Sequence, residues 1–248
     1  MLRAVLFASA VFSITSPAFA EEARAPDPDL KVSGGVTFVS QYRFRGISLS
    51  DEHAALQGTI NLNHKSGFYA GAWGSNIDGW GELGGSNVEL DLYGGWKGQV
   101  TKGVTLEAGL LYYAYPGSKG GDFEFFEPYA KVSGQLGPVS ATVGATYAWK
   151  QDALAGNDNL YLFNDNSVPI KGIPITLTSH VGYSSGSSAL AAGDDYIDWG
   201  LGATAAWKNL TLGVSYVDTN INEAQALSVG AARGIVDSAI VVSLGATF

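Results

Sequence analysis

The chain has 248 residues, no cysteine and a formal charge of −9, with 23 acidic side chains against 14 Lys and Arg. The acidic balance argues against nucleic acid as a partner, because binding to phosphates needs Lys and Arg. The lack of cysteine excludes disulfides and thiolate metal sites. Glycine (33 residues) and the aromatic side chains (11 Phe, 12 Tyr and 6 Trp) are abundant. Glycine spread through alternating strands is unusual for a packed soluble core and is easier to place where strands face a lumen or lie close against their neighbours.

The amino terminus carries the pattern of a secretory signal peptide. Arg3 precedes an apolar run over residues 4–14, and Ala18-Phe19-Ala20 forms a small-x-small cleavage signature. The run is too short for a membrane-spanning helix, which needs about 20 apolar residues; a buried core helix is the weaker alternative. We expect a signal peptide over residues 1–20, an irregular periplasmic lead-in over 21–30, and one domain over 31–248.

The first part of that domain alternates between an apolar and a polar face. In residues 32–47, Tyr42 and Phe44 fall on the apolar parity, whereas Arg43 and Arg45 fall on the polar one. Successive side chains of a strand point to opposite faces, so this segment and residues 54–64 predict a hairpin with one face in lipid and one in water. Gly46 would let the chain bend into the first loop.

The same alternation recurs to the end of the chain, with no stretch of convincing helical period. About twelve strands are predicted, with boundaries uncertain by two to four residues. They cover residues 32–47, 54–64, 67–77, 86–97, 103–115, 122–134, 138–150, 158–169, 173–184, 195–207, 210–219 and 234–248. The segment 158–169 is ambiguous, because both of its parities are apolar.

Link lengths and aromatic positions favour a closed membrane barrel over a soluble β-sandwich. Short links alternate with longer polar ones, as in bacterial outer-membrane barrels. Aromatic residues on the apolar parity gather at strand ends, as two girdles around an aliphatic band would require; a sandwich core would place them in mid-strand. The predicted fold is all-β: a single closed antiparallel transmembrane β-barrel in the bacterial outer membrane of a Gram-negative cell.

The last strand ends on Phe248, after the alternating residues Ile240, Val242, Leu244 and Ala246. A terminal aromatic on an amphipathic strand resembles the signal that the barrel assembly machinery recognises. We therefore expect that machinery and outer-membrane lipid as partners.

Three segments carry a resemblance to a known family. SQYRFRGISLSDEHAALQGTINL, SGFYAGAWGSNID and VELDLYGGW resemble the opening of the TorF-type putative porin family, most closely over residues 36–96. The resemblance implies an outer-membrane barrel and a channel. It brings no established substrate and no catalytic residues.

The polar parity should line the lumen, because Arg or Lys on the lipid face costs about 2–4 kcal/mol near the midplane. These side chains could form an electrostatic filter with weak cation preference, or pair with one another and plug the interior. The sequence leaves both open. The predicted pore-lining residues are Arg43, Arg45, Glu89, Asp91, Glu107, Glu127, Lys131, Lys150 and Asp198.

These patterns predict a porin-like channel for passive passage of ions or small solutes, with no cofactor and no metal. The alternative is an occluded barrel with a structural or loop-binding role. An outer-membrane hydrolase is less favoured, because His53, His64 and His180 show no serine partner on the lipid face near the outer rim. We expect a protein that is not an enzyme.

Overall fold

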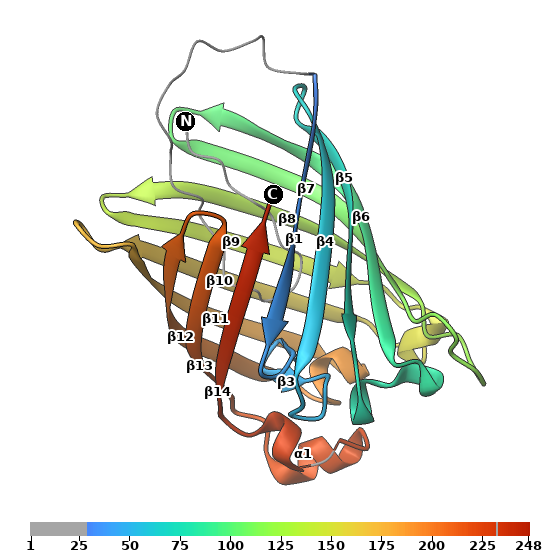
Figure 1. Ribbon diagram of the computed structural model, residues 1–248. Coiled ribbons are helices and arrows are strands. Elements are labelled where there is room, and N and C mark those ends of the chain that lie inside the picture. Colours follow the sequence, from blue (N-terminus) through green and yellow to red (C-terminus); the bar gives the residue numbers. More distant parts are fainter. Residues whose placement is uncertain (1–28, 232) are drawn as a thin grey trace.

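The computed structural model describes residues 29–231 and 233–248, so the predicted signal peptide and most of the lead-in lie outside the described residues. The described residues form a closed antiparallel barrel of twelve strands, in which sequence neighbours pair and β1 closes the ring between β4 and β14 (Figure 1). Its strands are β1 (Leu30–Val39), β4 (Ala55–His64), β5 (Phe68–Asn76), β6 (Val88–Thr101), β7 (Val104–Ala114), β8 (Phe125–Leu136), β9 (Val139–Ala148), β10 (Asn159–Pro169), β11 (Ile175–Gly186), β12 (Tyr196–Trp207), β13 (Leu210–Thr219) and β14 (Ala239–Thr247). The predicted fold class is confirmed.

The two ends of the barrel differ. We call the end with the short turns and Phe248 the turn end, and the opposite end, which carries the long loops, the loop end. At the turn end Phe248 pairs with Gly34 through two backbone hydrogen bonds, of 3.0 and 3.2 Å. The long loops contain the only α-helix among the described residues, α1 (Glu223–Ser228), and the short 3-10 helices Gly79–Gly81, Leu83–Gly85, Asp152–Leu154, Ala189–Ala191 and Arg233–Val236. Helix α1 was not predicted, because its six residues are too few to establish a helical period.

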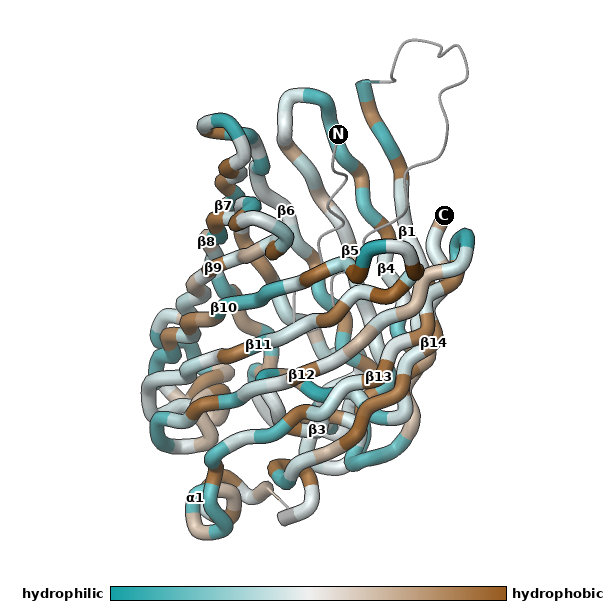
Figure 2. Tube along the Cα trace, turned by 90° about the vertical axis from the view of Figure 1, so that its left-hand side faces the viewer, coloured by the Kyte–Doolittle hydropathy of each residue, from teal (hydrophilic) through white to brown (hydrophobic). Residues whose placement is uncertain are grey.

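The outer face of the barrel is apolar. Aliphatic side chains such as Val36, Leu92, Val143 and Leu201 are exposed there, and in Figure 2 apolar and polar residues alternate along the strands. Aromatic side chains are exposed near both rims, including Tyr147, Trp149, Tyr183, Tyr216 and Phe126 toward the loop end and Phe68, Trp207 and Phe248 toward the turn end. This is the banded surface expected of a barrel that faces lipid.

One predicted strand, residues 32–47, is wrong in its second half. The wall strand β1 ends at Val39, and the chain then turns into the barrel and forms a small hairpin of β2 (Arg43–Phe44) and β3 (Ile47–Ser48). We call residues 40–50 the inner hairpin; every residue from 41 to 50 is buried. Tyr42 and Phe44, 1% and 7% exposed, therefore do not belong to the lipid-facing girdle.

The local backbone explains the hairpin. Arg45 and Gly46 form its two-residue turn and both have positive φ, 47° and 82°. Two positive values at the centre of a two-residue loop define the type I′ turn that matches the twist of paired strands.

Among the described helices, none is long and apolar enough to cross a membrane.

Candidate functional site

The inner hairpin is attached to the barrel wall through Arg45. Its guanidinium Nη2 lies 2.6 and 2.8 Å from the two carboxylate oxygens of Glu127, and Nη1 donates to Oδ1 of Asn159 at 2.7 Å. The same group lies over the ring of Tyr161, 4.2 Å from its centroid. Buried charges are tolerated only when paired and hydrogen-bonded, and this pair meets both conditions.

Arg43 attaches the hairpin to the loop end instead. Its Nη1 donates to the carbonyl oxygens of Gly46, Ile235 and Asp237 at 2.8 to 2.9 Å. Ile235 belongs to the β13–β14 loop, which also contains α1 and packs its apolar side chains against Ile47. The hairpin is therefore held between the wall and a loop that covers the loop end.

Aromatic side chains that point inward fill the space around the hairpin. Tyr42 packs on Trp73 with ring centroids 5.3 Å apart, and Phe44 meets Tyr113 edge-on at 6.1 Å. Tyr113 in turn stacks on Phe125. This cluster was not predicted, because alternation placed Tyr42 and Phe44 on the lipid face. The signal in the sequence is that Trp73 and Tyr113 share strand parity with polar residues.

Two carboxyl groups beneath the hairpin have no cationic partner among the residues that the structure describes. Glu89 and Asp91 point inward from β6 and are 1% and 0% exposed. Within residues 29–231 and 233–248, Oε2 of Glu89 and both carboxylate oxygens of Asp91 receive no hydrogen bond. The Tyr42 hydroxyl of the hairpin is 3.5 Å from the remaining oxygen, Oε1 of Glu89.

A second charged cluster lies nearer the turn end. Glu107 on β7 sits between Lys97 on β6 and Lys131 on β8, at 3.7 and 3.9 Å. The Tyr69 hydroxyl donates to Glu107 at 2.8 Å and also contacts the hydroxyl of Tyr129. This cluster contains two cations for one carboxylate.

On the opposite wall, His180 of β11 bridges two acids. Its Nδ1 lies 2.6 Å from Oδ1 of Asp165 and its Nε2 lies 2.9 Å from Oδ1 of Asp198. The Tyr161 hydroxyl is 2.9 Å from the same Nε2. His180 is thus part of a polar network in the barrel wall, and its partners here are acids and a tyrosine.

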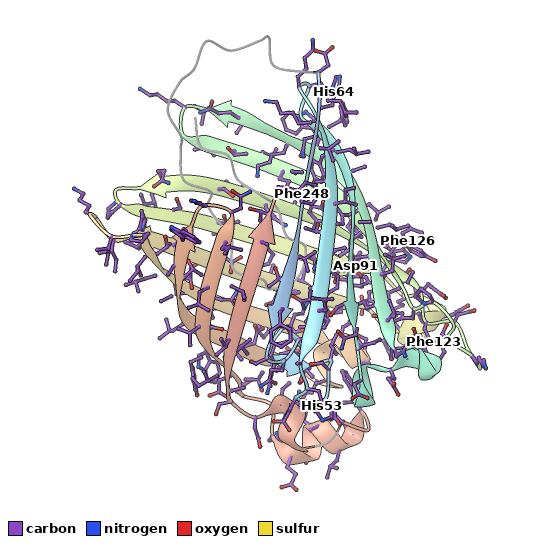
Figure 3. The ribbon with its side chains drawn as sticks, viewed as in Figure 1. His53, His64, Asp91, Phe123, Phe126 and Phe248 are labelled. Carbon is purple, nitrogen blue, oxygen red and sulfur yellow. The ribbon has the colours of Figure 1, made fainter. Side chains whose placement is uncertain are left out.

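The remaining predicted residues lie away from these clusters. Lys150 is exposed, two residues beyond the end of β9. His53 and His64 lie at opposite ends of the barrel (Figure 3). Nδ1 of His64 contacts the Ser66 hydroxyl at 2.7 Å, but both side chains are exposed at a turn.

His53 instead joins two loops. Its Nδ1 lies 2.9 Å from Oδ2 of Asp78. This contact has the largest effect in lowering the pKa of Asp78, and a hydrogen bond from the backbone N–H of Gly79 lowers it further. The acid side chain at the start of the β5–β6 loop is therefore charged at neutral pH.

A small cavity lies beside the hairpin. A cavity of about 60 Å³ lies between it and the wall, lined by Thr37, Gln41, Gln57, Thr211, Ser215 and Ser243 among others; this volume holds a few water molecules. Within the described part of the chain, no group of three or more His, Cys, Asp or Glu side chains could hold a metal ion.

These features define the class of the molecule: a closed β-barrel with an apolar exterior, a charged interior and a loop folded into its lumen. The chain belongs to the Gcw_chp family, described as a bacterial protein of unknown function, whose model matches residues 22–248. The predicted TorF-type resemblance is a finer statement that this match does not confirm. No curated protein sequence matches the chain.

Solved structures share the fold at low sequence identity. The KdgM porin superposes with a TM-score of 0.58 at 11% identity, covering 87% of this chain and 99% of the other. The NanC porin gives 0.57 at 12%, covering 88% and 99%. The COG4313 outer membrane channel from Pseudomonas putida F1 gives 0.50 at 11%, covering 91% and 99%.

Proposed function

We propose that this protein is a channel in the bacterial outer membrane for passive passage of ions or small solutes, and that the structure is its closed state. The observation that carries the proposal is a closed barrel with an apolar outer face and charged inward side chains. Barrels with a water-filled channel carry polar side chains on the inner face of the wall, and so do barrels whose lumen is plugged by a loop. The shared fold of the KdgM and NanC porins supports the same assignment.

The exterior supports the location and the partners. An apolar band with aromatic rims fits outer-membrane lipid. Phe248 ends the last strand at the turn end, where the barrel assembly machinery would meet it. A secretory signal over residues 1–20 is part of the same proposal.

The interior charges favour cations or neutral solutes. One similar structure is described as the KdgM porin in complex with disordered oligogalacturonate, which is an acidic sugar. Among the described residues of this chain, Glu89 and Asp91 face the interior without a cationic partner. Their negative charge would disfavour anions in the part of the lumen near the loop end. We therefore propose weak cation preference.

A second function is favoured by a specific observation. Because all residues from 41 to 50 are buried inside the barrel, the protein could be a permanently occluded barrel with a structural or loop-binding role. Electrical recording separates the two functions.

The purified full chain, incorporated into planar bilayers, should give discrete current steps with long closed periods, because the inner hairpin must leave the lumen before ions pass. A heat-denatured sample is the control for contaminating channels. A complete lack of current across voltages and pH values would contradict the channel and favour the occluded barrel.

A further inference from the structure

The charges beneath the inner hairpin do not balance. Glu89, Asp91 and Glu127 are all buried, and Arg45 is the cation that pairs with one of them, Glu127. Glu127 is close enough to Asp91 to act on it electrostatically. An ionised carboxylate buried without a partner is costly, so the hairpin closes over two carboxyl groups that need another source of neutralisation.

The geometry indicates a proton as that source. Glu89 and Asp91 lie two residues apart on β6, so both buried side chains point to the same inward face. Two neighbouring carboxyl groups can share a hydrogen bond only if one of them carries a proton. The described residues place no cation against them. The other titratable groups that face the pair are Tyr42 from the hairpin, Tyr93 from β6, Tyr113 and Tyr115 from β7 and its end, and Glu127 from β8.

The hairpin is what keeps water from the pair. Tyr42, 1% exposed, lies against both Trp73 and Glu89. If residues 40–50 left the lumen, the pair would meet water, where carboxyl groups ionise near pH 4. The closed state therefore binds at least one proton more than the open state.

We propose that Glu89 and Asp91 form a proton-binding lock on the inner hairpin, so that low pH closes the lumen and rising pH opens it. The inference rests on the proposed channel function and adds its regulation. The sign follows from linkage: the state with more bound protons is favoured by acid. One proton of difference changes the open-to-closed ratio about tenfold per pH unit over the range in which the closed state stays protonated.

A thiol-labelling experiment tests the lock independently of current. The chain contains no cysteine, and Ser48 of the hairpin is 0% exposed. In the variant Ser48→Cys, the labelling rate should rise with pH by about tenfold per unit after division by the rate of Ser66→Cys, an exposed reference at the turn end. The division removes the pH dependence of thiol chemistry itself.

Neutral replacements at the pair should abolish this response. Glu89→Gln with Asp91→Asn leaves no proton to lose, so normalised labelling of Ser48→Cys should stay low at every pH. The matched control is Glu107→Gln, a buried carboxyl that has its own lysine partners and should keep the pH response. If the double variant fails to assemble, the response of Ser48→Cys alone and of Ser48→Cys combined with each single replacement preserves the test.

Four results would overturn the lock. Labelling that does not depend on pH would do so, and so would an unchanged response in the double variant. A response removed by EDTA and restored by calcium would assign the neutralising charge to a metal ion. Steady current without pH dependence contradicts the lock alone, whereas pH-dependent labelling without current contradicts the channel alone.

Discussion

Arg45 is the residue on which the position of the inner hairpin most depends. It is buried and has a positive φ in the type I′ turn, and its guanidinium donates hydrogen bonds to Glu127, Asn159 and Thr146. Removing one member of a buried ion pair leaves the other charge without a partner, which typically costs 3–5 kcal/mol, more than the pair itself contributes.

Arg45→Ala should therefore lower the free energy of unfolding by about 3–5 kcal/mol, measured by denaturant titration in lipid vesicles. Because the lost contact holds the hairpin, the variant should also spend more time conducting. Arg45→Met combined with Glu127→Gln removes both charges and should recover most of the stability. If the single and double variants were equally stable, Glu127 would not depend on Arg45 for its neutralisation.

At the scale of the element, the inner hairpin is the part of the fold that the sequence predicted least well. Alternation continues from Val32 through Phe44, because a strand in the wall and a strand in the lumen have the same period of two. What changes at Ser40 is the direction of the chain, which periodicity does not record. The Arg45-Gly46 pair marked a bend, but its neighbours in space, Glu127 and Asn159, are more than 80 residues away.

Gly46 gives the sharpest test of the hairpin as an element. A Cβ atom there would lie 2.3 Å from Thr219 Cγ2 and 3.0 Å from Asp198 Cβ, at φ of +82°. Gly46→Ala should therefore push the hairpin away from β12 and β13 and cost about 1–3 kcal/mol through backbone strain. Its expected signature is a higher open probability in single-channel records, together with a lower unfolding free energy.

The matched control is Gly58→Ala on β4, where nothing lies within 4 Å of the added Cβ. It should leave both the open probability and the stability near wild type. Equal behaviour of the two variants would show that the fit of the hairpin against the wall does not limit opening.

The architecture of the whole barrel was predicted from the sequence more accurately than the inner hairpin was. Strand number, antiparallel order and the apolar exterior followed from alternation and link length, because a barrel in lipid must place apolar residues outward on every strand. The interior was less accessible: parity placed Glu107 and Asp198 inside, but the partners Lys97 and His180 depend on register across strands. Register depends on which residues of two neighbouring strands pair. Alternation within each strand excludes a shift by one residue but leaves shifts by two open.

The charges of the whole interior lead to a final prediction, on ion preference. The cluster at Glu107 contains two lysines. Glu89 and Asp91 have no cationic partner among the described residues, and His180 contacts two acids. Once the lumen is open and the acidic pair is ionised, the acids outnumber the bases along the path. Reversal potentials in a KCl gradient should therefore show a modest cation preference that weakens as salt rises, since exposed charges are screened.

Opposite changes within one cluster make this prediction specific. Glu107→Gln should shift the reversal potential toward anions, and Lys131→Gln, its neighbour at 3.9 Å, should shift it toward cations. Both variants change one charge at the same depth of the barrel, so a difference in pore width cannot produce opposite shifts. Anion preference in the wild type, or shifts of the same sign in both variants, would mean that these interior charges do not set which ions pass.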